Sequence, residues 1–245
     1  MKQFCAAFIL LFLTVSCHGI FEDLYDNGKE VETLEIGFNK SEKFTGTIYL
    51  DCRNYSEWIF IDLANKKTQH IPIPETLTGE WDGVSGWTFH DVDVKKNTFT
   101  ERDFIKTDTQ QKPEKWHFAI HHFDVMTNGA GVFETGYKSL SDLPPSSKAF
   151  ENETFVYDEI TDNQAIVDRT QMLSYYIGYQ KISLNKVLSG WATMDFSNPP
   201  PTYSSTGDVY ILKFPDNSFC ALLLDDFKAA DGTKGFMTMS YIYPY

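Results

Sequence analysis

The sequence predicts an all-β protein of mostly antiparallel sheets with very little helix. Strand-forming residues are abundant, since aromatic side chains alone make up 16% of the 245 residues, and they occur in short runs together with Val, Ile and Thr. Gly, Pro, Asn, Asp and Ser separate these runs, as is typical of turns. A helical pattern is scarce, because only 183–189 (SLNKVLS) indicates a short helix.

Six runs have the length and composition of strands. In chain order they are 44–51, 57–63, 115–126, 208–214, 218–225 and 235–243. The long third run, KWHFAIHHFDVM, is predicted to be one strand that ends at the turn Thr127-Asn128-Gly129. Pro215-Asp216-Asn217 separates the fourth run from the fifth, which predicts a hairpin. A further short strand is expected at 165–167, and loops are expected at 140–151 and 196–207.

The start of the chain has the features of an export signal. Lys2 is followed by ten apolar residues, Phe4–Leu13, which is too short for a membrane span of about 20 residues and fits a signal peptide. Cys17, preceded by Ser16, resembles the lipidation site of bacterial lipoproteins, although Thr14 stands where those proteins prefer leucine. Plain secretion with cleavage nearby is the alternative.

The expected organisation follows from this start. It is a signal peptide at 1–16, a lipidated acidic tether at 17–30 and a single β domain at 31–245. The protein is then an outer-membrane lipoprotein, expected at the cell surface, with release from the surface left open.

The charge balance restricts the partners. The chain carries 34 acidic and 21 basic residues, a formal net charge of −13. Nucleic acid requires a basic stripe, so this composition argues against it. The same balance argues against binding to anionic lipid headgroups, so the membrane contact would be made by the acyl chains on Cys17.

Two cysteines remain once Cys5 is assigned to the leader and Cys17 to the lipid. They are Cys52 and Cys220, and both stand in strand-like runs. An exported compartment permits a disulfide between them, but a buried free cysteine is an ordinary small apolar side chain. Free thiols are the favoured interpretation.

No motif for catalysis is present in the sequence. It lacks Gly-x-Ser-x-Gly, a phosphate-binding glycine loop and His-Glu-x-x-His, so the protein is not expected to be an enzyme. His121 and His122 suggest a metal site, but neighbours on a strand point to opposite faces and cannot hold one ion together. Asp124 is expected on the face of His122. The favoured interpretation is one buried, hydrogen-bonded histidine and one exposed histidine.

The methionines divide by their place in the predicted strands. Met194, Met237 and Met239 lie within strand-like runs and are expected in the core. Met126 and Met172 stand at the ends of elements, where a side chain can also reach a ligand. Their spacing alone favours the core for these two as well.

Four groups of residues follow one another in a fixed order along 43–245. They are 115–125 with Thr127-Asn128-Gly129, then Ile166-Val167-Asp168 with Met172 and Ile177-Gly178-Tyr179, then 185–191 (NKVLSGW) with Pro199-Pro200-Pro201, and finally 234–236 with 241–244. In this set and order the chain resembles the HmuY family of haem-binding lipoproteins from Bacteroides-like bacteria.

The resemblance implies a fold of antiparallel sheets that grips one haem between loops and strand ends. It also implies a role, since family members take haem from host haemoproteins and pass it to a TonB-dependent outer-membrane receptor. Their axial ligands are histidines or methionines. One comes from the segment after the Ile-Val-Asp strand, which carries over to Met172. The other comes after the Thr-Asn turn, but 127–150 contains no histidine or methionine, which leaves Tyr137, Lys138, or Met126 just outside.

The expected function is therefore a surface haemophore with haem as its cargo, with Met172, Tyr137 and Met126 as candidates for axial ligation. The alternative is a structural or adhesive surface lipoprotein of the same fold that does not bind haem. The departure at the first ligand position is what favours this alternative.

Overall fold

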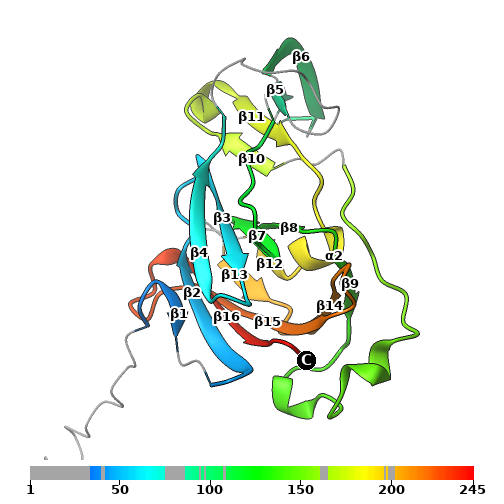
Figure 1. Ribbon diagram of the computed structural model, residues 1–245. Coiled ribbons are helices and arrows are strands. Elements are labelled where there is room, and N and C mark those ends of the chain that lie inside the picture. Colours follow the sequence, from blue (N-terminus) through cyan, green and yellow to red (C-terminus); the bar gives the residue numbers. More distant parts are fainter. Residues whose placement is uncertain are drawn as a thin grey trace, which may run out of the picture. The chain divides into compact units, whose positions relative to one another are not determined.

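The computed structural model describes residues 34–39, 42–74, 86–93, 95–96, 98–106, 109–160, 165–195, 197 and 202–245. Leu34–Tyr245 form one compact unit (Figure 1). The expected signal peptide, Cys17 and the expected tether lie outside the described residues. No helix in the described part of the chain has the length and apolar composition needed to cross a membrane.

Six antiparallel strands form the largest sheet, in the order β1-β2-β16-β15-β14-β9. They are β1 (Gly37–Asn39), β2 (Thr45–Asp51), β9 (Gly131–Glu134), β14 (Val209–Lys213), β15 (Phe219–Lys228) and β16 (Lys234–Ile242). A four-stranded sheet has the order β4-β3-β7-β8. Its strands are β3 (Glu57–Asp62), β4 (Lys67–Pro72), β7 (Phe118–His121) and β8 (Asp124–Thr127).

A second four-stranded sheet has the order β10-β11-β5-β6 and stands at the top of Figure 1. Its strands are β5 (Gly86–Asp93), β6 (Thr98–Lys106), β10 (Ala165–Asp168) and β11 (Tyr176–Lys181). The pair β12 (Ala192–Asp195) and β13 (Thr202–Ser205) completes the strands. Within the described residues, helix is limited to α2 (Lys186–Ser189) and to the 3-10 turns η1 (Leu140–Asp142), η2 (Ser147–Phe150) and η3 (Met172–Ser174). The fold is all-β, as predicted.

Alternating side chains of β16 show how the largest sheet buries one face. Met237, Met239 and Tyr241 are buried, whereas the residues between them are partly exposed. Because successive side chains of a strand point to opposite faces, this period of two places one face on the core. The cluster that these residues join also contains Ile59 and Ile61 of β3, so the largest sheet and the β4-β3-β7-β8 sheet share one core.

Strand β3 is buried on both of its faces. Ile59 and Ile61 belong to the core shared with the largest sheet. Trp58 and Phe60 belong to a second cluster, which includes Val167 of β10. A strand covered on both sides reads as a continuous apolar run, which is why WIFI precedes Asp62 in the sequence.

The prediction of one long strand at 115–126 is wrong. The chain forms a tight hairpin in which β7 pairs with β8, with Ala119 opposite Met126. His122 and Phe123 form the turn, and His122 has a left-handed φ of +54°. The sequence did not show the turn because neither residue is a usual turn former.

Most other predicted elements agree with the structure. The runs at 44–51, 57–63, 208–214, 218–225 and 235–243 correspond to β2, β3, β14, β15 and β16. The hairpin at Pro215-Asp216-Asn217 is confirmed, and Asn217 has the left-handed φ (+65°) that such turns favour. Within the predicted loop at 196–207, however, Thr202–Ser205 form β13, because they pair with β12. Strands β1, β4, β6, β9 and β11 were not predicted.

The two cysteines of the β unit are buried and carry free thiols. Burial raises the pKa of both thiols, and for Cys52 the neighbouring carboxylate of Asp51 adds to the effect. Both therefore stay protonated and unreactive at neutral pH.

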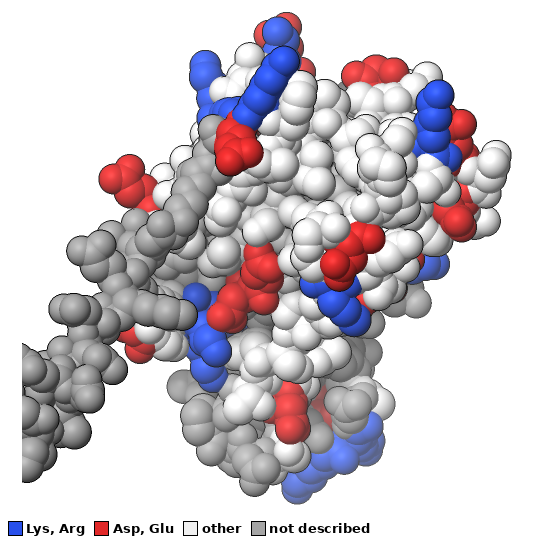
Figure 2. Space-filling view, turned by 90° about the horizontal axis from the view of Figure 1, so that it is seen from below, with Lys and Arg blue, Asp and Glu red and all other residues white. Residues whose placement is uncertain are grey.

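On the face that is seen from below, acidic and basic side chains are not separated into large patches of one charge. Figure 2 shows acidic and basic residues in small groups there, with uncharged residues between them. Among the described residues visible on this face there is no extended basic stripe of the kind that nucleic acid requires.

A buried polar network ties β8 to α2. The carboxylate of Asp158 accepts hydrogen bonds from the Thr127 backbone N–H (2.6 Å), the Thr127 hydroxyl (2.8 Å) and the Asn185 amide (3.1 Å). Burial raises the pKa of Asp158, and these three hydrogen bonds act against that rise. Asn185 is fully buried, donates to the Val156 carbonyl (2.9 Å) and accepts from the Leu188 N–H (3.0 Å) as the N-cap of α2.

Replacing Asn185 tests this network. We expect Asn185→Ala to lower the free energy of unfolding by about 2 to 3 kcal/mol, because it removes a helix cap and leaves buried groups without partners. Asn185→Asp is the matched variant, since aspartate keeps the acceptor that caps α2 but loses the amide donor and faces the carboxylate of Asp158. We expect it to be no more stable than Asn185→Ala in urea denaturation. Wild-type stability of Asn185→Asp would show that capping alone matters.

Candidate functional site

Three large apolar side chains stand exposed on the loop between β10 and β11. Met172 is 47% exposed, Leu173 97% and Tyr175 57%. The loop backbone is closed by hydrogen bonds from the Met172 N–H to the Arg169 carbonyl and from the Tyr175 N–H to the Met172 carbonyl, both 3.0 Å. A group of exposed apolar side chains on an ordered loop is a typical feature of a binding surface.

Arg169 lies at the base of this loop and contacts Tyr55, which precedes β3. Its Nη1 donates to the Tyr55 hydroxyl (2.7 Å), and its guanidinium lies 4.7 Å from the centre of the Tyr55 ring. On the other side, the Tyr55 ring stacks on His122 with centroids 4.5 Å apart. The Tyr55 hydroxyl is also 2.6 Å from His122 Nε2. Tyr55 thus links the loop between β10 and β11 to the turn of the β7–β8 hairpin.

The hydrogen atoms of this link can be assigned from chemistry. Arginine only donates, so the Tyr55 oxygen accepts from Arg169 and its own O–H donates to His122 Nε2. This requires a neutral His122. Burial lowers the pKa of His122 to about 3, with smaller contributions from His121 and from the charge of Arg169. Burial also raises the pKa of Tyr55, so its hydroxyl keeps its proton at neutral pH.

His121 has a different environment. It is buried, its Nε2 donates to the Tyr55 carbonyl (2.9 Å), and its Nδ1 lies 3.5 Å from a carboxylate oxygen of Asp124. The predicted buried, hydrogen-bonded histidine is therefore His121. The expectation of an exposed partner is wrong, because His122 is partly buried against Tyr55. Asp124 lies near His121 rather than on a face with His122, since the two histidines stand where the hairpin turns.

The structure does not bring the three predicted iron ligands together. Met126 is 1% exposed and packs in the cluster with Trp58. Tyr137 is 38% exposed and follows β9, where its carbonyl accepts from the Val209 N–H (2.8 Å). Met172 stands beyond β10, and Figure 1 shows β10 and β9 in different regions of the unit. Among the described residues, no group of three His, Cys, Asp or Glu side chains is placed to hold a metal ion.

The other methionines divide between core and surface. Met237 and Met239 are buried, as predicted. The core prediction for Met194 is wrong, because it is 37% exposed on β12. It lies in the pair β12–β13, to which no third strand of the described residues is hydrogen-bonded.

Sequence reasoning did not find Tyr55 or Arg169. Tyr55 is 67 residues from His122 and 114 from Arg169, so their contacts arise only from the tertiary fold. The sole local signal was the position of Arg169 directly after the Ile166-Val167-Asp168 strand.

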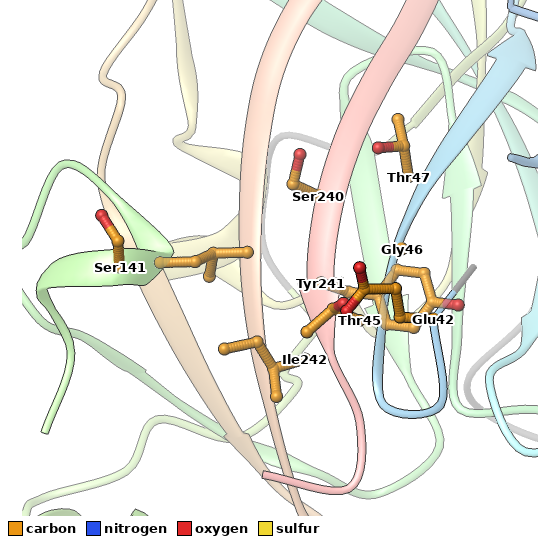
Figure 3. Close-up of a pocket in the computed structure, with 9 residues that line it drawn as sticks. Glu42, Thr45, Gly46, Thr47, Ser141, Ser240, Tyr241 and Ile242 are labelled. Carbon is orange, nitrogen blue, oxygen red and sulfur yellow. The ribbon is translucent and has the colours of Figure 1, made fainter. Parts of the chain in front are cut away.

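A groove of about 710 Å³ lies elsewhere, between β2, β16 and η1 (Figure 3). Its lining includes the hydroxyl side chains of Thr45, Thr47, Ser141 and Ser240 together with Glu42. It contains no histidine or methionine, so it offers no soft ligand for iron, and it is not part of the candidate site.

A family model and solved structures relate this chain to one family. A family model described as HmuY protein matches residues 54–241. A search of the curated proteins finds no match.

Solved structures of related proteins have a similar fold. A candidate lipoprotein from Bacteroides fragilis is 31% identical, with a TM-score of 0.65 over 86% of this chain and 96% of that one. A candidate HmuY-like heme-binding protein from Bacteroides vulgatus is 30% identical, with a TM-score of 0.64 over 86% and 99%. The apo HmuY analog of Tannerella forsythia is 20% identical, with a TM-score of 0.59 over 82% and 96%, and shows likeness of fold alone.

The neutral state of His122 predicts a dependence of stability on pH. Folded His122 has a pKa of about 3, whereas histidine in an unfolded chain has one of about 6.5. Between these values the unfolded chain binds more protons, so this contribution is complete above about pH 6.5 and is lost as the pH falls. In His122→Asn, which tolerates the left-handed φ, the free energy of unfolding should decline less between pH 7 and 4. Urea denaturation at several pH values measures this, and parallel curves for the two proteins would contradict it.

Proposed function

The chain belongs to the HmuY family, and from that premise we propose that it is an exported lipoprotein that captures haem and passes it to an outer-membrane uptake receptor. The Bacteroides vulgatus relative, 30% identical, is described as heme-binding, which supports the proposal. On this reading the protein binds and transfers a cargo rather than catalysing a reaction. Host haemoproteins would be the source of the haem and a TonB-dependent receptor its destination.

The exposed loop that carries Met172 is the observation on which the proposal depends. Haem is a large apolar plate, and Met172, Leu173 and Tyr175 offer it an apolar surface of matching character. The thioether of methionine is an established axial ligand of haem iron. Because Met172 is half exposed rather than packed in the core, its side chain can contact a ligand without any change in the fold.

The second axial position is not assembled in the described conformation. Met126 would have to leave the cluster around Trp58, and Tyr137 lies beside β14. A six-coordinate iron with either residue therefore requires one segment to move. This favours, as the second candidate, a structural or adhesive lipoprotein of the same fold that does not bind haem.

A haemin titration separates the two candidates. We expect a Soret band that shifts and saturates at about one equivalent, and Met172→Ala should weaken binding at least about tenfold, because even loss of an outer-shell partner costs about 10- to 100-fold in affinity. Met194→Ala is the matched control, since Met194 is similarly exposed on β12 and should leave binding unchanged. Equal affinity of Met172→Ala and wild type would remove Met172 as a ligand. No saturable shift in the wild type would favour the structural lipoprotein.

We further propose that Cys17 is lipidated and anchors the protein to the outer membrane, facing outward. The apolar run Phe4–Leu13 ahead of Ser16-Cys17 supports this, as does the relative from Bacteroides fragilis described as a candidate lipoprotein.

Replacing Cys17 tests the anchor. Cys17→Ala should release the protein from the membrane fraction, because no thiol remains for the lipid at that position, while Cys5→Ala, within the expected leader, should not. Immunoblots of fractionated cells measure the distribution. Membrane retention of Cys17→Ala would contradict lipid anchoring at this residue.

A further inference from the structure

We propose that Arg169 binds a propionate of the haem and that Tyr55 holds the Arg169 side chain in position. Arg169 would then be the carboxylate-binding group of the loop between β10 and β11, called here the Met172 loop. This assignment rests on the proposed function and deepens it, because it names the part of the ligand that the site recognises besides the iron. Three observations support it: the guanidinium is held in a fixed orientation, it has no anionic partner among the described residues, and it lies on the same loop as Met172.

The guanidinium of Arg169 is oriented before any ligand arrives. It is fixed by one hydrogen bond to the Tyr55 hydroxyl (2.7 Å) and by its place over the Tyr55 ring (4.7 Å). Tyr55 is itself fixed by His122, through a 2.6 Å hydrogen bond and ring stacking. Holding a long side chain in its bound geometry reduces the entropy lost on binding.

Most of the hydrogen-bonding capacity of Arg169 is still open. A guanidinium has five N–H donors, and Tyr55 accepts from one of them. Among the residues that the structure describes, no carboxylate forms an ion pair with Arg169. In a chain with 34 acidic and 21 basic residues, a cation without an anionic partner is free to bind an incoming one. The planar fork of arginine suits a carboxylate, which it can bind through two parallel hydrogen bonds.

Arg169 and Met172 belong to one short loop. The Met172 N–H donates to the Arg169 carbonyl (3.0 Å), so the fold fixes the backbone positions from which the cation and the thioether extend. Haem carries an iron that accepts a thioether and propionates that accept a guanidinium. The loop therefore offers both complementary groups beside an apolar surface made by Leu173 and Tyr175.

Esterified haem separates the two kinds of contact. We expect wild-type protein to bind haemin about tenfold more tightly than haemin dimethyl ester, because only free propionates form charge-assisted hydrogen bonds with Arg169. Arg169→Gln should lose about tenfold in affinity for haemin and nothing for the diester, so that the preference disappears. Tyr55→Phe keeps the ring under the guanidinium and removes the hydrogen bond. Its preference for haemin over the diester should lie between that of the wild type and that of Arg169→Gln.

Arg53→Gln is the matched control. Arg53 also lies over an aromatic ring, that of Phe236 (4.4 Å), but it is paired with Asp51 (2.6 Å). It should keep the full preference for haemin. Far-UV circular dichroism and thermal unfolding of each variant establish that it is folded.

Two results would overturn the assignment. One is an equal loss for haemin and diester in Arg169→Gln, which indicates a role in shaping the loop only. The other is wild-type binding of both ligands without preference, which leaves haem binding standing and removes the propionate contact. Failure of the wild type to bind either ligand would instead refute the proposed function itself, and the propionate assignment with it.

Discussion

The burial of β3 on both faces is the constraint on which the rest of the fold depends. Its side chains alternate between two separate cores, with Ile59 and Ile61 in one and Trp58 and Phe60 in the other. A slip of one residue in its pairing would exchange the two sets and place indole where an isoleucine fits. The register of β3 against β4 and β7 is therefore fixed by packing on both sides, and the sheets on either side are fixed with it.

Polar contacts then connect β3 to the sheet that carries the candidate site. The Trp58 indole donates to Gln180 of β11 (2.7 Å), and Gln180 donates to Gln110 (2.9 Å), all within a buried environment. Buried polar groups of this kind are costly unless they are satisfied, so such a chain favours one arrangement of the elements it joins. Because β10 and β11 flank the Met172 loop, the position of that loop follows from the core rather than from the loop itself.

The sequence predicted what local patterns determine. The period-two burial around Met237 and Met239 and the turn at Asn217 were both readable, since each depends on a few adjacent residues. The hairpin at His122 was not, because its turn has no glycine, asparagine or proline and its left-handed residue is held by the stack on Tyr55. A local pattern cannot report a conformation that a distant side chain stabilises.

The long-range contacts of the candidate site were not predicted, for the same reason. The family resemblance pointed to Met172, and the structure shows it exposed. Spacing alone favoured the core for Met172 and Met126 alike, and only the tertiary fold separates them. The contact between Arg169 and Tyr55 spans 114 residues of sequence, and nothing in either segment indicates the other.

Four side chains of the candidate site, those of Met172, Arg169, Tyr55 and His122, keep a constant charge over the mildly acidic and neutral range. Methionine does not titrate, arginine stays charged, and burial keeps the Tyr55 hydroxyl protonated. His122, the one imidazole in contact with Tyr55 through its hydroxyl, has a pKa of about 3 and is neutral throughout. A histidine ligand with an ordinary pKa would begin to protonate in this range. The loop therefore presents the same thioether, cation and apolar surface whether its surroundings are neutral or mildly acidic, provided that the fold around β3 holds Tyr55 in place.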